Sequence, residues 1–154
     1  MKNLIPFLIM TLAAIATTAC SPKPSATGKT AEEILGSPDY QAICYGGYRE
    51  KTREIQPTIP QLQEDMKILH AMGIRIVRTY NVHFDEAANL LEAIRQIKKD
   101  EPGFEMYVML GAWIDCKNAW TDLPDRIRNE ESQRNAVEVN RAVELTKQYP
   151  DIVK

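Results

Sequence analysis

The sequence contains few of the residues from which metal and redox sites are built, with three cysteines and two histidines among 154 residues. His70 and His83 have no cysteine or carboxylate at a spacing typical of metal ligands, so we expect no metal site. Cys44 and Cys116 follow different apolar runs, and we expect two unpaired thiols although an oxidising compartment would permit a disulfide. The two histidines are expected to be ordinary surface or packing residues and not zinc ligands.

An excess of one charge is also missing. The chain has 19 Lys+Arg against 21 Asp+Glu, a formal net charge of -2, so no nucleic acid or other polyanionic partner is expected. Gly46-Gly47 lacks the G-x-G-x-x-G spacing and is not followed directly by a helix start, which argues against a dinucleotide or phosphate loop. We therefore expect no cofactor. The hydrophobic content of 44% and charged content of 26% are those of a globular domain.

The long apolar run of the sequence lies at its start. It covers residues 4–16, follows Lys2, and is shorter than the roughly 20 apolar residues of a membrane-spanning helix. Residues 1–19 are typical of a secretory signal peptide, and the small residues before Cys20 resemble the lipobox of bacterial lipoproteins. This pattern predicts acylation of Cys20 and a lipid anchor in the bacterial cell envelope, in the periplasm or at the outer membrane. A plain secretory signal with an incidental cysteine is the alternative.

Composition divides the rest of the chain into two parts. Residues 20–39 are rich in Pro, Ser, Gly and Thr and are expected to form a flexible tether, with one helical turn possible over 31–35. Residues 40–154 alternate short apolar runs with longer amphipathic ones, as strands separated by crossover helices do. The predicted strands are 42–45, 74–80, 104–110 and the start of a fourth at 151–154; the predicted helices are 59–72, 85–99 and 130–149, with a loop over 114–129.

Three βα units and the start of a fourth strand predict a parallel α/β fold. We expect the N-terminal part of a (β/α)8 TIM barrel, an incomplete domain because such a barrel needs about 200 residues or more. An open doubly wound sheet is the alternative. The last helix is expected to bury Val139, Ala142, Val143 and Tyr149.

Each predicted strand ends in an aromatic side chain beside polar groups. Tyr45 follows the first strand, Arg78 and Tyr80 end the second, and Trp113 follows the third. The carboxyl ends of parallel strands are where ligands bind in α/β folds. Sugars stack their C–H faces on aromatic rings and need paired hydrogen-bond donors and acceptors, so this combination favours a carbohydrate ligand. Gly46-Gly47 indicates a tight turn, with or without a ligand beside it.

Four segments follow one another in order along the chain: Ile43-Cys44-Tyr45-Gly46, the helix start near Pro60, Arg78-Thr79-Tyr80-Asn81, and Val108-Met109-Leu110-Gly111-Ala112-Trp113. This ordered set resembles the strand signatures of glycoside hydrolase family 17, the β-1,3-glucanases and related glucan-modifying enzymes. The resemblance covers about residues 40 to 154. It implies a (β/α)8 barrel, a β-1,3-glucan substrate, and substrate-binding roles for Tyr45, Arg78 and Tyr80. Asn81, where the family often has Asp, and Trp113 depart from its pattern, and Trp113 is expected to shape a different subsite.

The family's retaining mechanism uses two glutamates, which in a retaining glycosidase lie about 5 Å apart. The resemblance places them at the fourth and seventh strands, so we expect no catalytic residue in this chain. Glu50, Asp85 and Asp115 lie in βα loops but are not expected to replace the pair.

Three functions stay open on the sequence. The first is the N-terminal fragment of a cell-envelope glycoside hydrolase acting on β-glucan, inactive and marginally stable by itself. The second is a non-catalytic glycan-binding surface lipoprotein. The third is a periplasmic α/β domain unrelated to carbohydrate, whose motifs are coincidental.

Overall fold

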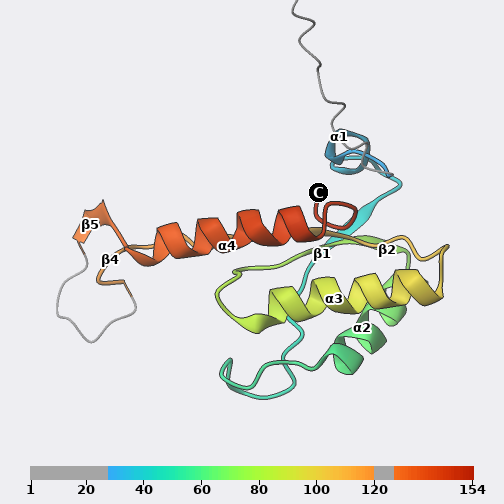
Figure 1. Ribbon diagram of the computed structural model, residues 1–154, viewed down its shortest axis with the longest axis horizontal. Coiled ribbons are helices and arrows are strands. Elements are labelled where there is room, and N and C mark those ends of the chain that lie inside the picture. Colours follow the sequence, from blue (N-terminus) through green and yellow to red (C-terminus); the bar gives the residue numbers. More distant parts are fainter. Residues whose placement is uncertain (1–27, 120–126) are drawn as a thin grey trace, which may run out of the picture.

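The computed structural model describes residues 28–119 and 127–154 of the protein (Figure 1). The expected signal peptide, the expected lipidation site Cys20 and Trp120 lie outside the described residues. Within the described ranges, no helix has both the length and the apolar character needed to cross a membrane.

The centre of the fold is a parallel sheet. Its strands are β1 (Gln41–Cys44), β2 (Ile74–Arg78) and β3 (Tyr107–Met109), hydrogen-bonded in the order β1-β2-β3. Val153 forms an isolated parallel bridge with Val108, next to β3. The structure therefore confirms the three predicted strands, shorter than expected, and the start of a fourth strand beside the third.

Three long helices connect these strands: α2 (Ile59–Ala71), α3 (Asp85–Asp100) and α4 (Arg134–Gln148). The backbone N–H of Thr58 donates to Gln61 Oε1 at 2.9 Å, as the capping-box spacing predicts. Gly73 follows α2 with φ of 88°, a left-handed conformation that glycine adopts without strain. Local capping signals thus fix both ends of α2.

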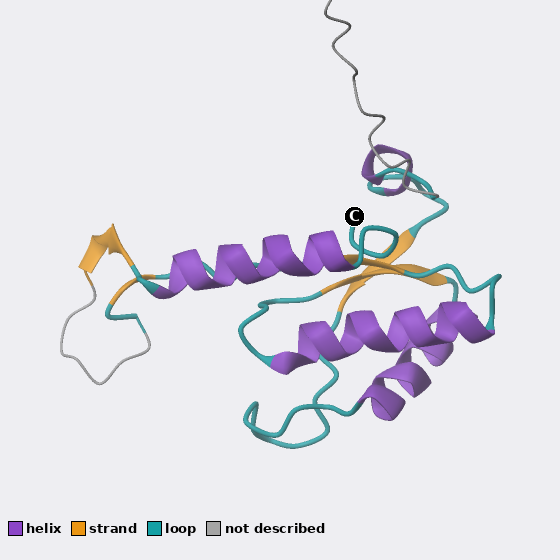
Figure 2. Ribbon diagram, in the orientation of Figure 1, coloured by secondary structure: helices purple, strands orange, loops and turns teal. Residues whose placement is uncertain are grey.

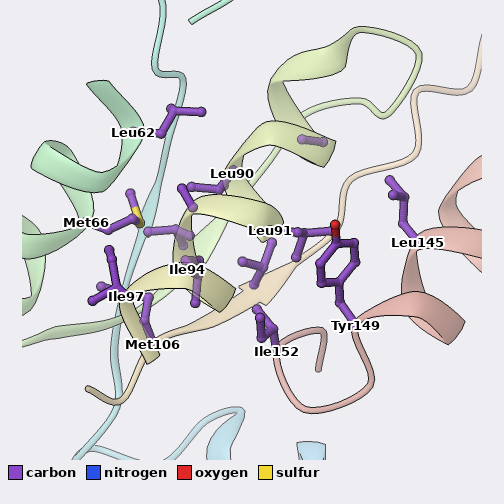
Figure 3. Close-up of a cluster of buried hydrophobic side chains, with 14 of the residues drawn as sticks. Leu62, Met66, Leu90, Leu91, Ile94, Ile97, Met106, Leu145, Tyr149 and Ile152 are labelled. Carbon is purple, nitrogen blue, oxygen red and sulfur yellow. The ribbon is translucent and has the colours of Figure 1, made fainter. Parts of the chain in front are cut away.

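All three helices pack against one face of the sheet. Figure 3 shows the buried side chains of this core, which come from the helices, from β3 and from the segment before the last bridge. In the strands, Val77 and Val108 are fully buried and belong to the same cluster. The amphipathic character expected of these helices is confirmed at the buried positions Leu62, Met66, Leu90, Leu91, Ile94 and Ile97. Met72, which the helical spacing also assigns to the apolar side of α2, is exposed.

The N-terminal segment covers the part of the opposite face around Ile76 and Tyr107, whereas the residues of β1 are exposed. Figure 1 shows the short helix α1 (Ala31–Ile34) on the other side of the sheet from α2 and α3. Ile34 is fully buried against Ile76 and Tyr107, and Lys29 forms an ion pair of 3.1 Å with Glu105. This part of the expected tether is therefore attached to the sheet, because α1 buries an apolar side chain that the local composition did not reveal.

The connection from β3 to α4 differs from the expected loop. It contains a two-stranded antiparallel hairpin, β4 (Cys116–Lys117) with β5 (Ile127–Glu131), which lies at the far end of α4 in Figure 2. The predicted helix start at residue 130 is therefore wrong by four residues. Residues 127–131 carry mostly charged and polar side chains. Because β5 pairs only with β4 and buries no apolar face, its sequence shows no alternation of apolar and polar residues from which a strand could be predicted.

The buried side of α4 also differs from the expectation. Leu145 and Tyr149 are buried, but Val139 and Val143 are each 45% exposed. Asn135 and Glu138 are buried instead, on the side of α4 that faces the rest of the protein. Polar residues that are buried for a specific contact cannot be recognised by hydrophobic periodicity.

Candidate functional site

A cavity of about 760 Å³ lies at the carboxyl ends of β2 and β3. The β1–α2 loop contributes one side chain, and the β2–α3 loop, the β3–α4 connection and the first turns of α4 contribute the others. The lining residues are Arg53, Asn81, His83, Phe84, Trp113, Asp115, Arg134, Val137 and Glu138. The position agrees with the general rule for ligands of parallel α/β sheets.

A buried glutamate joins the walls of this cavity. Glu138 is 2% exposed, and its Oε1 accepts hydrogen bonds from the backbone N–H groups of Val82 at 2.7 Å and Trp113 at 3.0 Å. Its Oε2 lies 3.0 Å from Nδ1 of His83. One carboxylate of α4 therefore holds the ends of two different βα connections, and a buried carboxylate is tolerated because donors surround it.

A second side chain of α4 fixes the start of the hairpin. Asn135 is buried, and its Oδ1 accepts from the N–H of Asp115 while its Nδ2 donates to the carbonyl of Asp115, both at 2.9 Å. The side-chain amide of Asn135 thus pairs with both the backbone N–H and the backbone carbonyl of Asp115, as the backbone of a neighbouring strand would. The Asp115 backbone is thereby anchored to α4 at the wall of the cavity.

Of the predicted substrate-binding residues, Trp113 lines the cavity, and its side chain is 37% exposed. Tyr80 is 43% exposed and Arg78 is also exposed, but neither lines the cavity. The Arg78 guanidinium lies 6.0 Å from the centre of the Tyr80 ring, within the range of a cation–π contact. The sheet register places Arg78 on the same face as Cys44 of β1.

Tyr45 has a different environment from the other predicted residues. Its ring packs against the main core, and its hydroxyl donates to Asp65 Oδ2 of α2 at 2.6 Å. Burial, together with the neighbouring Asp65 carboxylate, raises the pKa of the Tyr45 hydroxyl. The structure therefore gives Tyr45 a packing contact between β1 and α2, and contact of this ring with a substrate stays a prediction.

The two glycines after Tyr45 approach a buried carboxylate. The N–H of Gly47 donates to Glu86 Oε1 at 2.7 Å, and Glu86 is almost completely buried at the start of α3. Burial raises the pKa of Glu86, although the Gly47 N–H and the Tyr48 side chain oppose that shift. The glycines thus let the β1–α2 loop pass close to the first turn of α3.

We predict that the two neighbouring glycines respond differently to alanine. A Cβ at Gly47 would lie 2.4 Å from Leu62 Cδ2 and 2.7 Å from the Tyr45 hydroxyl oxygen, whereas a Cβ at Gly46 would have no neighbour nearer than 3.9 Å. Gly47→Ala should lower the free energy of unfolding by about 2 kcal/mol through overpacking. Gly46→Ala, the matched control, should stay within about 0.5 kcal/mol of the unchanged protein. Urea unfolding of both variants tests this, and equal losses would contradict the assignment.

The site contains residues that the sequence did not single out. His83 was expected to be isolated, and Glu138 and Asn135 were hidden in a helix with an ordinary amphipathic pattern. Their contacts join residues 55 and 20 positions apart in the chain, so no local spacing could reveal them. In residues 28–119 and 127–154, no group of three or more potential metal ligands occurs, and Cys44 and Cys116 are free thiols.

The chain is similar to an endo-laminarinase. That protein, from Formosa Hel1_33_131, has a crystal structure that matches with 60% sequence identity and a TM-score of 0.79, over 82% of this chain and 32% of that chain. The present chain therefore spans about a third of the length of the laminarinase. No protein-family model matches the sequence, and a search of curated proteins gives no match.

The match agrees with the fold described above. A mixed α/β arrangement with a parallel sheet and four helices is similar to part of a glycoside hydrolase. At 60% identity the likeness concerns the sequence as well as the backbone, so it bears on the functional proposal and not on the fold alone.

Proposed function

We propose that this chain is the N-terminal part of a cell-envelope glycoside hydrolase acting on β-glucan, with β-1,3-linked glucan as the substrate. The observation that carries the proposal is the 60% identity to an endo-laminarinase over 82% of the chain. The cavity at the carboxyl ends of β2 and β3, with an accessible Trp113 in its wall, supports a sugar as the ligand. Membership of glycoside hydrolase family 17, which the sequence motifs suggest, is part of the same proposal.

The arrangement of the strands supports a (β/α)8 barrel as the complete fold. The strands follow one another in sequence order, and the bridge at Val153 continues that order beside β3. A doubly wound sheet reverses direction at its switch point, so its fourth strand does not follow the third in this way. The helices α2, α3 and α4 share one face, as the outer helices of a barrel do.

We propose that both catalytic glutamates lie in residues that follow Lys154, and that the present residues bind and orient the glucan. In the described ranges, three carboxylates near the strand ends already have other contacts. Glu138 accepts from two backbone N–H groups, Glu86 accepts from Gly47, and Asp85 pairs with Arg141 at 2.9 Å. A retaining glycosidase needs one protonated and one ionised carboxyl group facing the same bond, about 5 Å apart.

Anchoring through Cys20 is a further part of the proposal. It rests on the signal-like residues 1–19 and on the small residues before Cys20. Metabolic labelling with radioactive palmitate in the producing bacterium tests it, with Cys20→Ser as the control. Label that is present in the unchanged protein and lost in Cys20→Ser is expected. Release of unlabelled protein into the medium would contradict the anchor.

The substrate is tested with laminari-oligosaccharides and the protein expressed from its own complete gene. We expect new reducing ends and no comparable activity on β-1,4-linked cello-oligosaccharides. Binding without new reducing ends would instead favour a glycan-binding surface lipoprotein. Absence of both binding and cleavage with any neutral glucan would overturn the glycan proposal.

A further inference from the structure

The N-terminal residues 29–40, which we call the docked segment, are attached to the sheet by an apolar side chain. Ile34 of α1 is fully buried, and it packs against Ile76 of β2 and Tyr107 of β3. A capping box closes the start of α1. A helix of four residues has little stability of its own, so the burial of Ile34 is the main contact that holds the docked segment in place.

Polar side chains close both ends of the docked segment against the start of β3. Glu105 lies two positions before β3, and its Oε1 accepts from Lys29 Nζ at 3.1 Å, from the Tyr40 hydroxyl at 3.1 Å and from the Tyr107 hydroxyl at 2.9 Å. Lys29 Nζ also donates to the Tyr40 hydroxyl. The first and last residues of the docked segment therefore meet at one carboxylate.

The docked segment and the cavity lie at opposite ends of the parallel strands. The segment contacts Glu105 and Tyr107 at the start of β3, and Ile76 pairs with Tyr107 in the sheet register. The cavity includes Asn81 and Trp113, which follow β2 and β3. Figure 1 shows α1 close to the start of β1 and far from the hairpin of β4 and β5, which follows Trp113. The chain therefore enters the domain on the side away from the cavity.

Docking shortens the chain between the domain and the proposed lipid anchor. Nine residue steps lead from Cys20 to Lys29, and they span at most about 32 Å when fully extended. Without docking, the free chain would run to Gln41 and could span about 75 Å. A globular domain of the size of residues 40–154 is about 35 Å wide. The shorter chain does not reach around such a domain, whereas the longer one would.

We propose that the docked segment orients the protein on a lipid bilayer, with the amino ends of the strands toward the membrane and the cavity away from it. The inference rests on the lipid anchor at Cys20 in the proposed function, and it holds for any ligand of the cavity. An outward-facing cavity is accessible to a polymer that is too large to enter the space between protein and bilayer. Residues 29–40 resemble a tether in composition but act as an orienting element.

Energy transfer to the bilayer measures this orientation. The lipidated protein from its own complete gene is placed in vesicles of phosphatidylethanolamine and phosphatidylglycerol that contain a rhodamine-labelled lipid as the acceptor. A donor dye is attached to p-azidophenylalanine in place of Lys99, exposed in the last turn of α3, or of Lys51, exposed in the β1–α2 loop. We expect about twofold higher transfer from position 99 than from position 51, because the chain to the anchor is shorter than the domain is wide.

Two changes should abolish this difference by separate routes. Ile34→Asp places a charge at a fully buried position and should release the docked segment, so the ratio of the two transfers should fall to about one. Leu35→Asp, at a neighbouring side chain that is 36% exposed, is the matched control and should keep the ratio. Insertion of about 20 Gly and Ser residues before Gly28 lengthens the free chain, leaves the docked segment unchanged, and should also lower the ratio to about one.

The outcomes separate the orientation from the proposed function. Equal transfer from the two positions in the unchanged protein would overturn the orientation. An undiminished ratio in the insertion variant would overturn it as well, and that variant alters no buried residue. Absence of transfer from both positions would refute the lipid anchor and this inference together. Glucan cleavage is measured without vesicles and is independent of all these results.

Discussion

Replacement of Gly111 by alanine is expected to lower the free energy of unfolding by about 3 kcal/mol, the upper end of the usual cost of overpacking. A Cβ at this position would lie 2.3 Å from the carbonyl oxygen of Thr79 and 2.8 Å from the carbonyl carbon of Tyr80. These are backbone atoms at the end of β2, and they cannot rotate away as a side chain does. The N–H of Thr79 donates to the carbonyl of Met109, and the Thr79 hydroxyl accepts from the N–H of Gly111. A shift that relieves the clash would break these hydrogen bonds between the ends of β2 and β3.

Gly103 provides the matched control for this substitution. A Cβ there meets no atom within 4 Å, and its φ lies outside the left-handed range. Gly103→Ala should therefore change stability by no more than about 0.5 kcal/mol. Urea unfolding of the two variants measures the difference. A Gly111→Ala variant as stable as Gly103→Ala would show that β2 and β3 do not approach as closely as described.

The same close approach has a consequence for the cavity. Gly111 lies two residues before Trp113, and Thr79 lies two residues before Asn81. A displacement that relieves the clash would therefore move both walls of the cavity. Sugar affinity should fall in Gly111→Ala together with stability, and Gly103→Ala should lose neither.

Much of the fold could be predicted because its signals are local. The apolar stripe of α2 with its capping box, the stop at Gly73 and the apolar run of β3 all lie within a few neighbouring residues. Strand order followed from the alternation of strands and helices, since crossover connections bring consecutive strands side by side. The hairpin of β4 and β5 was not predicted because its residues show no alternation of apolar and polar side chains.

The candidate site was predictable in place but not in detail. The rule that ligands gather at the carboxyl ends of parallel strands led to Trp113 and to the loop that holds Asn81. It led equally to Tyr45, whose hydroxyl is engaged with Asp65 of α2. Successive residues of a strand point to opposite faces of the sheet, so the face that Tyr45 takes depends on where β1 ends. The two glycines that follow Tyr45 do not reveal that point. Glu138 depends on tertiary packing, so only the structure identifies it.

Removal of the Glu138 carboxylate is expected to have an effect at least as large as that of Gly111→Ala. Glu138→Ala would remove the acceptor of the buried Val82 N–H and of the partly buried Trp113 N–H, and it would remove the partner of His83. Each unpaired buried donor costs about 1–3 kcal/mol, and we expect a total loss of about 4 kcal/mol in the free energy of unfolding. The variant should also lose sugar affinity, because Trp113 would no longer be held in the wall of the cavity.

Glutamine at this position distinguishes the hydrogen bonds from the charge. In Glu138→Gln the amide oxygen can accept from both N–H groups, and the amide nitrogen can donate to Nδ1 of His83 when that nitrogen carries no proton. This variant should therefore lose about 1 kcal/mol or less at a pH where His83 is neutral. Glu144→Ala, at an exposed glutamate of the same helix, should change stability by no more than about 0.5 kcal/mol. Equal losses for Glu138→Ala and Glu144→Ala would refute the role of Glu138 in joining the two walls.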